Sequence, residues 1–255
     1  MPLDIVTIPC RTDNYAYVLR DQATGTVAVV DVPELGPVME ALQARGWGCD
    51  LILITHHHDD HIAGVADLRV AFGAEVVGAE ADMHRLPPLD RAVSEGDEVW
   101  VGDSVGRVLD VSGHTVGHIA FHFADSDAAF TADSLMALGC GRVFEGTPQM
   151  MCASLSKLAA LPGETLVYSG HEYTQANAKF AKTIEPDNPE LAVRIADIAT
   201  KRARGEPTVP ATIAEELRTN PFLRAKEPGV KAAVGLAGAS DVDVFAEVRR
   251  RKDRF

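Results

Sequence analysis

In the first half of the chain, apolar residues form short runs. These runs are separated by residues that favour turns. Such runs, bounded by Gly, Asp, Asn or Pro, are typical of β-strands. They predict strands over residues 3–8, 15–20, 26–31, 51–54, 75–79, 98–101, 106–111, 118–123 and 127–131. The run LILI at 51–54 is apolar at every position, which is typical of a strand buried on both faces.

Helical spacing of apolar residues appears twice between these strands and then dominates the last third of the chain. Segments 34–46 and 62–73 each end in a glycine, which predicts two helices. After about residue 172, helices punctuated by prolines are predicted over 174–184, 189–205, 212–218 and 243–253. We therefore expect an α/β domain over residues 1–172 followed by a helical domain over residues 173–255.

Charge and cysteine usage narrow the class of protein. The 255-residue chain has a formal net charge of −13, and an acidic field disfavours both nucleic acid and anionic membranes as partners. The four cysteines form no C-x-x-C pair, which fits a reducing compartment, and we expect a cytoplasmic enzyme. The first residues do not have the pattern of a secretory signal, and no apolar run approaches the ~18 residues of a membrane span.

The stretch THHHDDH at 55–61 follows the apolar run and concentrates metal-binding side chains. In an extended loop alternate side chains point the same way, so His56 and His58 can reach one ion while His57 points away. Asp60 and His61 begin the following helix and offer an oxygen and a nitrogen to a neighbouring ion. Imidazole with carboxylate suits zinc first, with iron or manganese as alternatives.

Three further candidate ligands follow apolar strands elsewhere in the chain. His114, Asp133 and His171 each come after a β-like run and beside small residues, and ligands at sheet ends are typical of α/β sites. The hypothesis has two divalent metal ions, the first held by His56, His58 and His114, the second by Asp60, His61 and His171, with Asp133 bridging. His84 and His122 are expected to bind no metal, and His57, His118 and Asp59 to play supporting structural roles.

The loop T-H-x-H-x-D-H resembles the signature of the metallo-β-lactamase superfamily. The resemblance implies an αββα sandwich with a dinuclear site at one edge, and all seven proposed ligands match the family's ligand positions. A narrower resemblance, to the glyoxalase II family of hydroxyacylglutathione hydrolases, rests on the motifs TDNYAYVL, SGHTVGH, TADSL, GCGRVFEGTPQMM, SGHEYT and RRRKD. It runs almost from end to end of the chain and implies hydrolysis of S-lactoylglutathione to lactate and glutathione.

The same resemblance implies a glutathione-binding set made of Arg142, Phe144, Tyr173, Arg249 and Lys252. Arg249 and Lys252 are three residues apart, so on a helix they share a face that suits a carboxylate. The family commonly has lysine at position 142, tyrosine at 144, an aromatic residue at 59 and glycine at 132. Phe144 lacks a hydroxyl, so one hydrogen bond to the glutathione end is absent.

The mechanism expected from this ligand set uses a hydroxide that bridges the two metals. A bridging water becomes a nucleophile near neutral pH, and a thiolate leaves without a dedicated acid. Asp60 and Asp133 are the catalytic carboxylates in this scheme, because they fix the metal geometry and orient the hydroxide. The chain has no G-x-S-x-G motif that would supply a serine nucleophile instead.

Three other functions remain open from the sequence. A glutathione-persulfide dioxygenase would use a single iron, with ligands close to His56, His58 and Asp133. A β-lactamase or lactonase is disfavoured, because the cysteines fit a reducing compartment and no secretory signal is expected. A metal-storage protein is disfavoured, because the ligand set has no redundant ligands. The enzyme is expected to act as a monomer on a small glutathione thioester.

Overall fold

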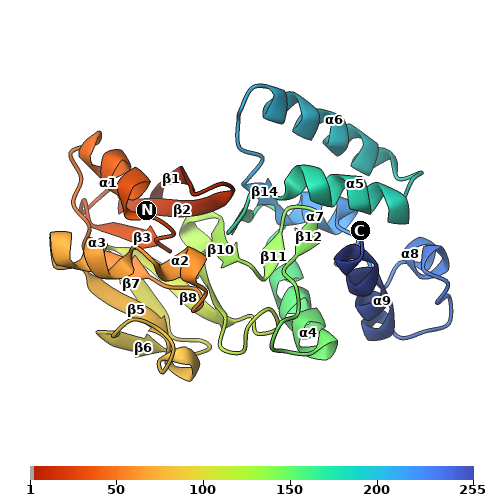
Figure 1. Cartoon of the computed structure of the whole chain (residues 1–255), viewed down its shortest axis with the longest axis horizontal. Helices are drawn as coiled ribbons and strands as arrows, with labels where there is room; N and C mark the ends of the chain where they lie inside the picture. The colour runs from red at the N-terminus through yellow and green to blue at the C-terminus, as the bar shows by residue number, and fades with distance from the viewer. Residues whose placement is uncertain (1–2) are drawn as a thin grey trace. The chain divides into compact units, whose positions relative to one another are not determined.

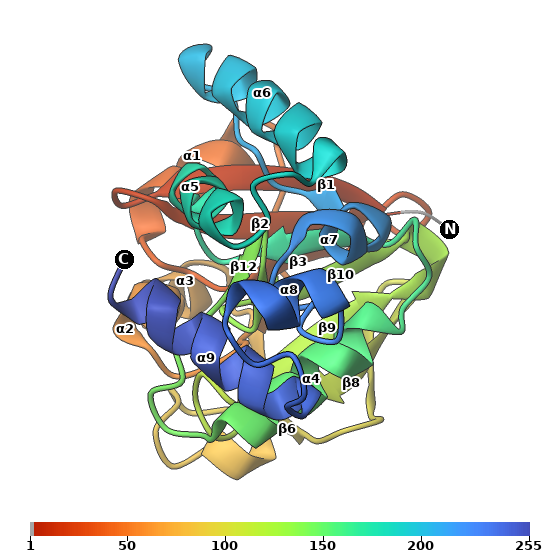
Figure 2. The same ribbon diagram turned by 90° about the vertical axis from the view of Figure 1, so that its right-hand side faces the viewer.

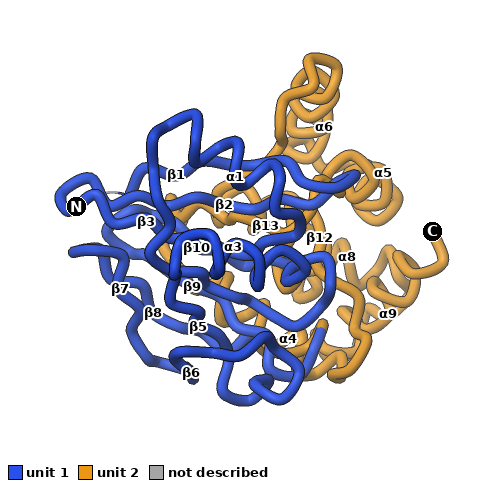
Figure 3. The backbone as a smooth tube through the Cα atoms, turned by 60° about the vertical axis from the view of Figure 1, so that its left-hand side comes forward, with its two compact units in different colours: residues 1–111, 115–132 blue, residues 112–114, 133–255 orange. Residues whose placement is uncertain are grey.

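The computed structural model describes residues 3–255, which divide into two compact units (Figure 3). The first unit runs to Val111 and resumes over Thr115–Ala132. The second unit holds Ser112–His114 and Asp133–Phe255. The chain therefore enters the second unit for three residues and returns to the first before it leaves for good.

The first sheet of the first unit places its strands in chain order: β1(Leu3–Cys10), β2(Asn14–Asp21), β3(Val27–Val30), β4(Leu51–Leu53), β5(Glu75–Ala79) and β6(Arg91–Val93). β1 to β3 are antiparallel, and β3 to β6 run parallel. β4 lies inside the sheet with all its residues buried, as the continuous apolar run predicted. The carboxyl ends of β3 and β4 consequently meet at one edge.

Helices cover one face of this sheet (Figure 1). Both α1(Leu35–Gln43) and α3(Val65–Phe72) turn their buried side chains onto the strands, and the shared core includes Val38, Leu42, Val65, Leu68, Val29, Ile52 and Val76. Trp47 packs at the border of this core, and the guanidinium groups of Arg20 and Arg45 lie over its ring. Helical spacing in the sequence thus marks the faces that are buried here.

A second sheet of the first unit runs in the antiparallel order β10(Ala128–Ala132), β9(Ile119–Phe123), β8(Ser104–Asp110), β7(Glu98–Val101). It faces the first sheet: the rings of Tyr17 and Phe130 lie 5.5 Å apart, and the Ser104 hydroxyl donates to Asp21. Trp100 on β7 is 49% exposed. Three short helical turns complete this unit: α2(Asp59–Ile62), η1(Glu80–Asp82) and η2(Ala124–Ser126).

The second unit is mainly helical. It contains β11(Leu135–Met136), β12(Gly139–Cys140), α4(Pro148–Ala159), β13(Leu166–Ser169), α5(Thr174–Ile184), α6(Pro189–Ala203), β14(Ala211–Thr212), α7(Ile213–Thr219), α8(Pro228–Ala233) and α9(Asp241–Asp253). β13 pairs with β14, and α5 packs on α6 through Ala178, Ala181, Leu191 and Ile198 (Figure 2). α9 lies beside α4.

The predicted helix over 62–73 is wrong in one respect, because the structure breaks it into α2 and α3 around Gly64. The Gly64 N–H donates to the carbonyl of Val32 at 2.9 Å. A Cβ at this glycine would lie 2.6 Å from Val32 Cγ1, so only glycine permits this approach. The break sets Asp60 and His61 in a single helical turn of their own.

Several elements carried no prediction. α4 was missed although Thr147 caps it and Pro148 opens it, both of which are usual helix-start signals. The strands β6, β11, β12 and β14 have two or three residues each, too few to show a period. None of the helices described between residues 3 and 255 combines the length and apolarity needed to cross a membrane.

Candidate metal centre

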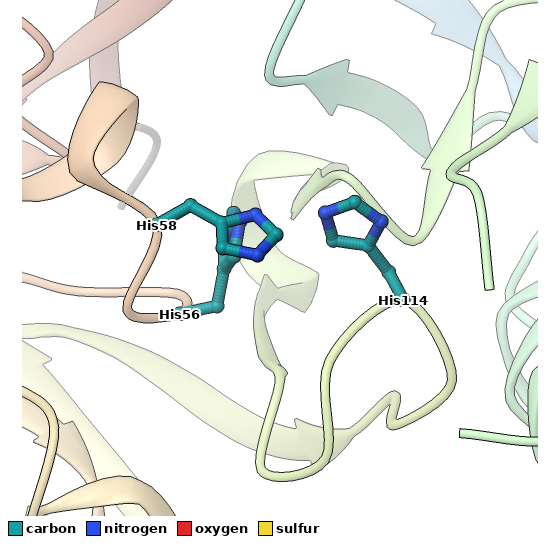
Figure 4. A group of neighbouring side chains, drawn as sticks. All are labelled: His56, His58 and His114. Atoms are coloured by element: carbon teal, nitrogen blue, oxygen red, sulfur yellow. The ribbon is translucent and has the colours of Figure 1, made fainter. Parts of the chain in front are cut away.

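The ligand loop leaves β4 and runs through Thr55–His58 into α2. His56 Nε2 lies 3.2 Å from His58 Nδ1, whereas His57 turns away and places Nδ1 2.8 Å from Asp82 Oδ2. Tetrahedral nitrogen ligands ~2.05 Å from one zinc ion would sit roughly 3.3 Å apart. The predicted alternation is confirmed, and Figure 4 shows His56 and His58 with their rings converging.

Asp31 favours one tautomer of His61 directly and of His56 through Thr55. The buried Asp31 follows β3, and its Oδ2 accepts from the Thr55 hydroxyl and from His61 Nδ1, both at 2.8 Å. Because Thr55 gives its proton to Asp31, its oxygen accepts from His56 Nδ1 at 3.0 Å. His56 and His61 therefore both present Nε2 as a lone pair, the form that binds a metal.

Sequence reasoning missed Asp31, because the signal for it requires the pairing of β3 with β4 to be known. β3 and β4 are parallel neighbours, so the residues after them meet at the same sheet edge. A carboxylate directly after VAVV, paired with the histidines after LILI, is that signal. Asp31, His56 and His61 each have a potential metal-binding atom within 4.8 Å of those of the other two. This group could hold a metal ion.

Supporting contacts surround the loop inside the first unit. His118 is buried and stacks on His56, with ring centroids 4.5 Å apart. Asp82, which bonds His57, also accepts from Arg85. These contacts agree with the structural roles expected for His57 and His118.

The second unit carries the other three candidate ligands. His114 Nε2 and His171 Nε2 each lie 3.4 Å from Asp133 Oδ2. His114 Nδ1 lies 2.7 Å from the carbonyl oxygen of Arg142, to which it donates. With its Nδ1 proton donated to the Arg142 carbonyl, the neutral form of His114 presents Nε2 as a lone pair, the form that binds a metal ion. The donor set therefore fits a bound metal ion.

Close backbone packing fixes this second set. A Cβ at Gly141 would lie 2.0 Å from the Asp133 carbonyl and 2.9 Å from His114 Nδ1. Ala132, directly before Asp133, has a φ of +41°, a conformation that favours glycine. His171 stacks on Tyr173 with centroids 4.6 Å apart and ring planes 6° from parallel. The three ligands are held by contacts that tolerate little change.

The residues implied for glutathione binding differ in exposure. Phe144 is 62% exposed and its ring lies 5.2 Å from that of His114, and Tyr173 is also exposed. Lys252 is half-buried, and burial followed by the charges of Arg249 and Arg142 lowers its pKa. Arg249 and Arg142 thus lie near enough to Lys252 to disfavour its charge, and Asp253 partly offsets them.

Arg249 is the exception, because it is buried and bonded within the protein. Its Nη1 donates to the Cys140 carbonyl at 2.9 Å, and its Nε donates to Asp253 at 2.9 Å. The guanidinium also lies 5.0 Å above the Phe222 ring. Arg249 therefore supports the second unit, whatever it adds to substrate binding.

The remaining histidines lie apart from these groups. His122 sits within β9, where burial lowers its pKa, and His84 is exposed after η1. All four cysteines have free thiols.

Comparison with known proteins gives full-length matches. A family model described as "Metallo-beta-lactamase superfamily" matches residues 12–171, and one described as "Hydroxyacylglutathione hydrolase C-terminus" matches residues 172–255. A Cereibacter sphaeroides protein called "Hydroxyacylglutathione hydrolase" is 64% identical over 255 residues, 100% of both chains.

Solved structures match as well. ETHE1 from Myxococcus xanthus is 28% identical, with a TM-score of 0.67 over 98% of this chain and 90% of that one. TTHA1623, in a di-iron-bound form, is 25% identical, with a TM-score of 0.64 over 86% of this chain and 100% of that one. The junction of the two family models lies beside the division predicted at 172, whereas the compact units divide at 132.

Proposed function

Because the chain belongs to the hydroxyacylglutathione hydrolases of the metallo-β-lactamase superfamily, we propose that its seven His and Asp ligands act together on S-lactoylglutathione. The enzyme is a thioester hydrolase of the glyoxalase II type. Its predicted α/β fold with a helical C-terminal region is confirmed. The products of the proposed reaction are lactate and glutathione.

The proposed centre uses the seven ligands that the family resemblance implies. His56, His58 and His114, which Figure 4 labels, would hold one ion, and Asp60, His61 and His171 would hold the other. Asp133 is shared between them, as its contacts with both His114 and His171 support. A further support is that one family model, over residues 12–171, spans all seven positions.

The observation that carries the proposal is the set of fixed tautomers. Asp31, the Thr55 hydroxyl and the Arg142 carbonyl accept hydrogen bonds from the Nδ1 atoms of His61, His56 and His114 respectively, and this leaves their Nε2 atoms as ligands. Bound metal ions supply a water activated for attack and a Lewis acid for the thioester carbonyl. The carboxylates of Asp60 and Asp133 hold the ligand geometry, and no serine motif competes with this chemistry.

Substrate binding is assigned to the second unit. Lys252 and Arg142 supply positive charge for the carboxylates of glutathione, and Arg249 holds α9 in place beside them. Phe144 and Tyr173 offer exposed rings next to His114 and His171. An apolar ring at position 144 favours van der Waals contact over a hydrogen bond with the tripeptide.

The finer assignments are also proposals. Zinc is the preferred metal, because imidazole dominates the donor set, with iron or manganese as alternatives. The four free thiols favour the cytoplasm, and a monomer suffices because all seven ligands come from one chain. A persulfide dioxygenase has less support, since the C-terminal model and the full-length relative both carry the hydrolase name.

The test combines a thioester panel with metal analysis on the same sample. We expect S-lactoylglutathione to be the best substrate among glutathione and other thioesters, with two ions bound per chain. Asp133→Ala should lower kcat at least ~100-fold and deplete metal, because second-sphere changes alone already cost 10–100-fold. Near-normal hydrolysis by a metal-depleted Asp133→Ala enzyme would rule the mechanism out. Oxygen uptake with glutathione persulfide, without hydrolysis, would favour the dioxygenase.

A further inference from the structure

The turn between β1 and β2 bonds the two aspartates at the start of α2. Arg11 Nη2 donates to the carbonyl oxygen of Asp59 at 3.1 Å and to its Oδ2 at 2.9 Å. Asn14 Nδ2 donates in the same way to Asp60, at 3.0 Å to the carbonyl oxygen and 3.1 Å to Oδ2. Each of the two consecutive aspartates is thus held by both its backbone and its side chain.

The two contacts differ in burial. The Asp59 side chain is 83% exposed, and exposed ion pairs of this kind contribute little. Asn14 is 5% exposed, so its amide protons depend on protein acceptors rather than on water. The contact with Asp60 is therefore the one that shapes the metal site.

The backbone contact replaces a missing helical bond. In a longer helix the Asp60 carbonyl would accept from the N–H of Gly64, four residues on. Gly64 instead donates to Val32, and α2 ends at Ile62. The Asn14 amide therefore donates to the Asp60 carbonyl in place of the Gly64 N–H.

The side-chain contact orders the carboxylate. Both acceptors are oxygens, so the amide must present its NH₂ group, and its orientation follows from chemistry alone. A bond to Oδ2 restricts rotation of the Asp60 carboxylate. A ligand ordered in advance binds an ion more tightly, because less freedom is lost on binding.

We propose that Asn14 is a positioning residue for the metal ion that Asp60 binds, acting through its two hydrogen bonds to that aspartate. Asn14 lies on β2, far from the ligand loop in sequence, and none of the assigned roles includes it. The proposal rests on the proposed function, since it takes Asp60 as a ligand. It adds to that function a residue that sets how tightly the protein binds one of the two ions.

Graded chelator titration of the full-length protein tests this role, with zinc per chain measured at each step. Asn14→Ala should weaken the binding of one ion by about 10–100-fold, the usual cost of removing a ligand's hydrogen-bond partner, and leave the affinity of the other within about twofold. Asn14→Asp keeps the shape of the side chain but turns a carboxylate toward Asp60, so its loss should exceed that of Asn14→Ala. In the zinc-limited enzyme kcat should fall while KM for the thioester stays the same.

Asp59→Asn is the matched control, because it alters the neighbouring exposed aspartate and should leave both zinc affinities unchanged. The melting temperature of the metal-free protein separates positioning from folding. If Asn14→Ala and Asn14→Asp bind both ions like the unmodified chain, or lose both equally, the inference is wrong. The proposed function fails separately, if the unmodified chain binds fewer than two ions or Asp60→Ala still binds two.

Discussion

At the scale of single residues, Arg249 and Lys252 share a helix but have different surroundings. Arg249 is 7% exposed and bonded to Cys140 and Asp253. Lys252 is half-buried, and its Nζ lies over the rings of Phe180 and Phe255. The same charge at two positions three residues apart is thus bonded to buried partners in one case and lies over aromatic rings in the other, and the proposed role in substrate binding falls to Lys252.

Substitution by alanine should separate these roles. Arg249→Ala should lower the free energy of unfolding by about 2 kcal/mol, because it removes hydrogen bonds from a buried charged group. Lys252→Ala should change the unfolding free energy by less than about 1 kcal/mol but raise KM for the glutathione thioester, with kcat retained. Urea unfolding and steady-state kinetics measure both. Equal loss of stability in the two variants would contradict this division.

At the level of single residues, the sequence predicted those candidate ligands that lie within recognisable motifs. His56, His58, Asp60 and His61 sit in one dense segment, and their spacing carries the chemistry. Asp31 and Asn14 act through hydrogen bonds from other strands, and a single Asp or Asn in a strand context looks like any turn residue. Partners of this kind become visible only when the pairing of the strands is known.

At the scale of elements, the two sheets of the first unit are joined by one buried carboxylate. Asp21 ends β2, and its Oδ2 accepts from the hydroxyl of Ser104, the first residue of β8, at 2.6 Å. Its Oδ1 accepts from Thr24 and Ala23. The Ser104 bond is the main reason that the pKa of Asp21 falls from 3.8 to about 2.

Ser104→Ala should therefore destabilise the protein by about 2 kcal/mol near neutral pH. The folded-state pKa is depressed, so the contribution is complete above about pH 4 and is lost as the pH falls toward 2. Urea unfolding of the metal-free protein at several pH values measures the difference between the two chains. Ser156→Ala, which removes an exposed bond within α4, is the control and should show no such window. If the difference in unfolding free energy between the two chains stays constant down to about pH 3, the role given to the Ser104–Asp21 bond is contradicted.

The prediction of helices and strands succeeded where the apolar residues recur with a clear period and failed where the elements are too short to show one. β1, β2 and β8 span seven or eight residues and were predicted within two residues or so of their ends. β11 and β12 pair over two residues each, and nothing local indicates them. The break at Gly64 depends on contact with Val32, which lies in a different part of the chain.

At the scale of the whole molecule, the family boundary and the compact units do not coincide. A cut after residue 172 would leave β13 without β14 and expose the buried side chains of α4, including Met151, Leu155 and Leu158. We expect a fragment of residues 1–172 to aggregate and to show no cooperative thermal transition. Size-exclusion chromatography and circular dichroism, with the full chain alongside, test this. A monomeric fragment that melts sharply would show that the catalytic part folds alone.

Both tryptophans of the chain, Trp47 and Trp100, belong to the first unit. Their fluorescence, excited selectively over that of tyrosine, consequently monitors that unit alone. Comparing an emission trace with far-ultraviolet ellipticity during denaturation would therefore reveal whether the two halves melt in a single concerted event or one after the other, without any added label.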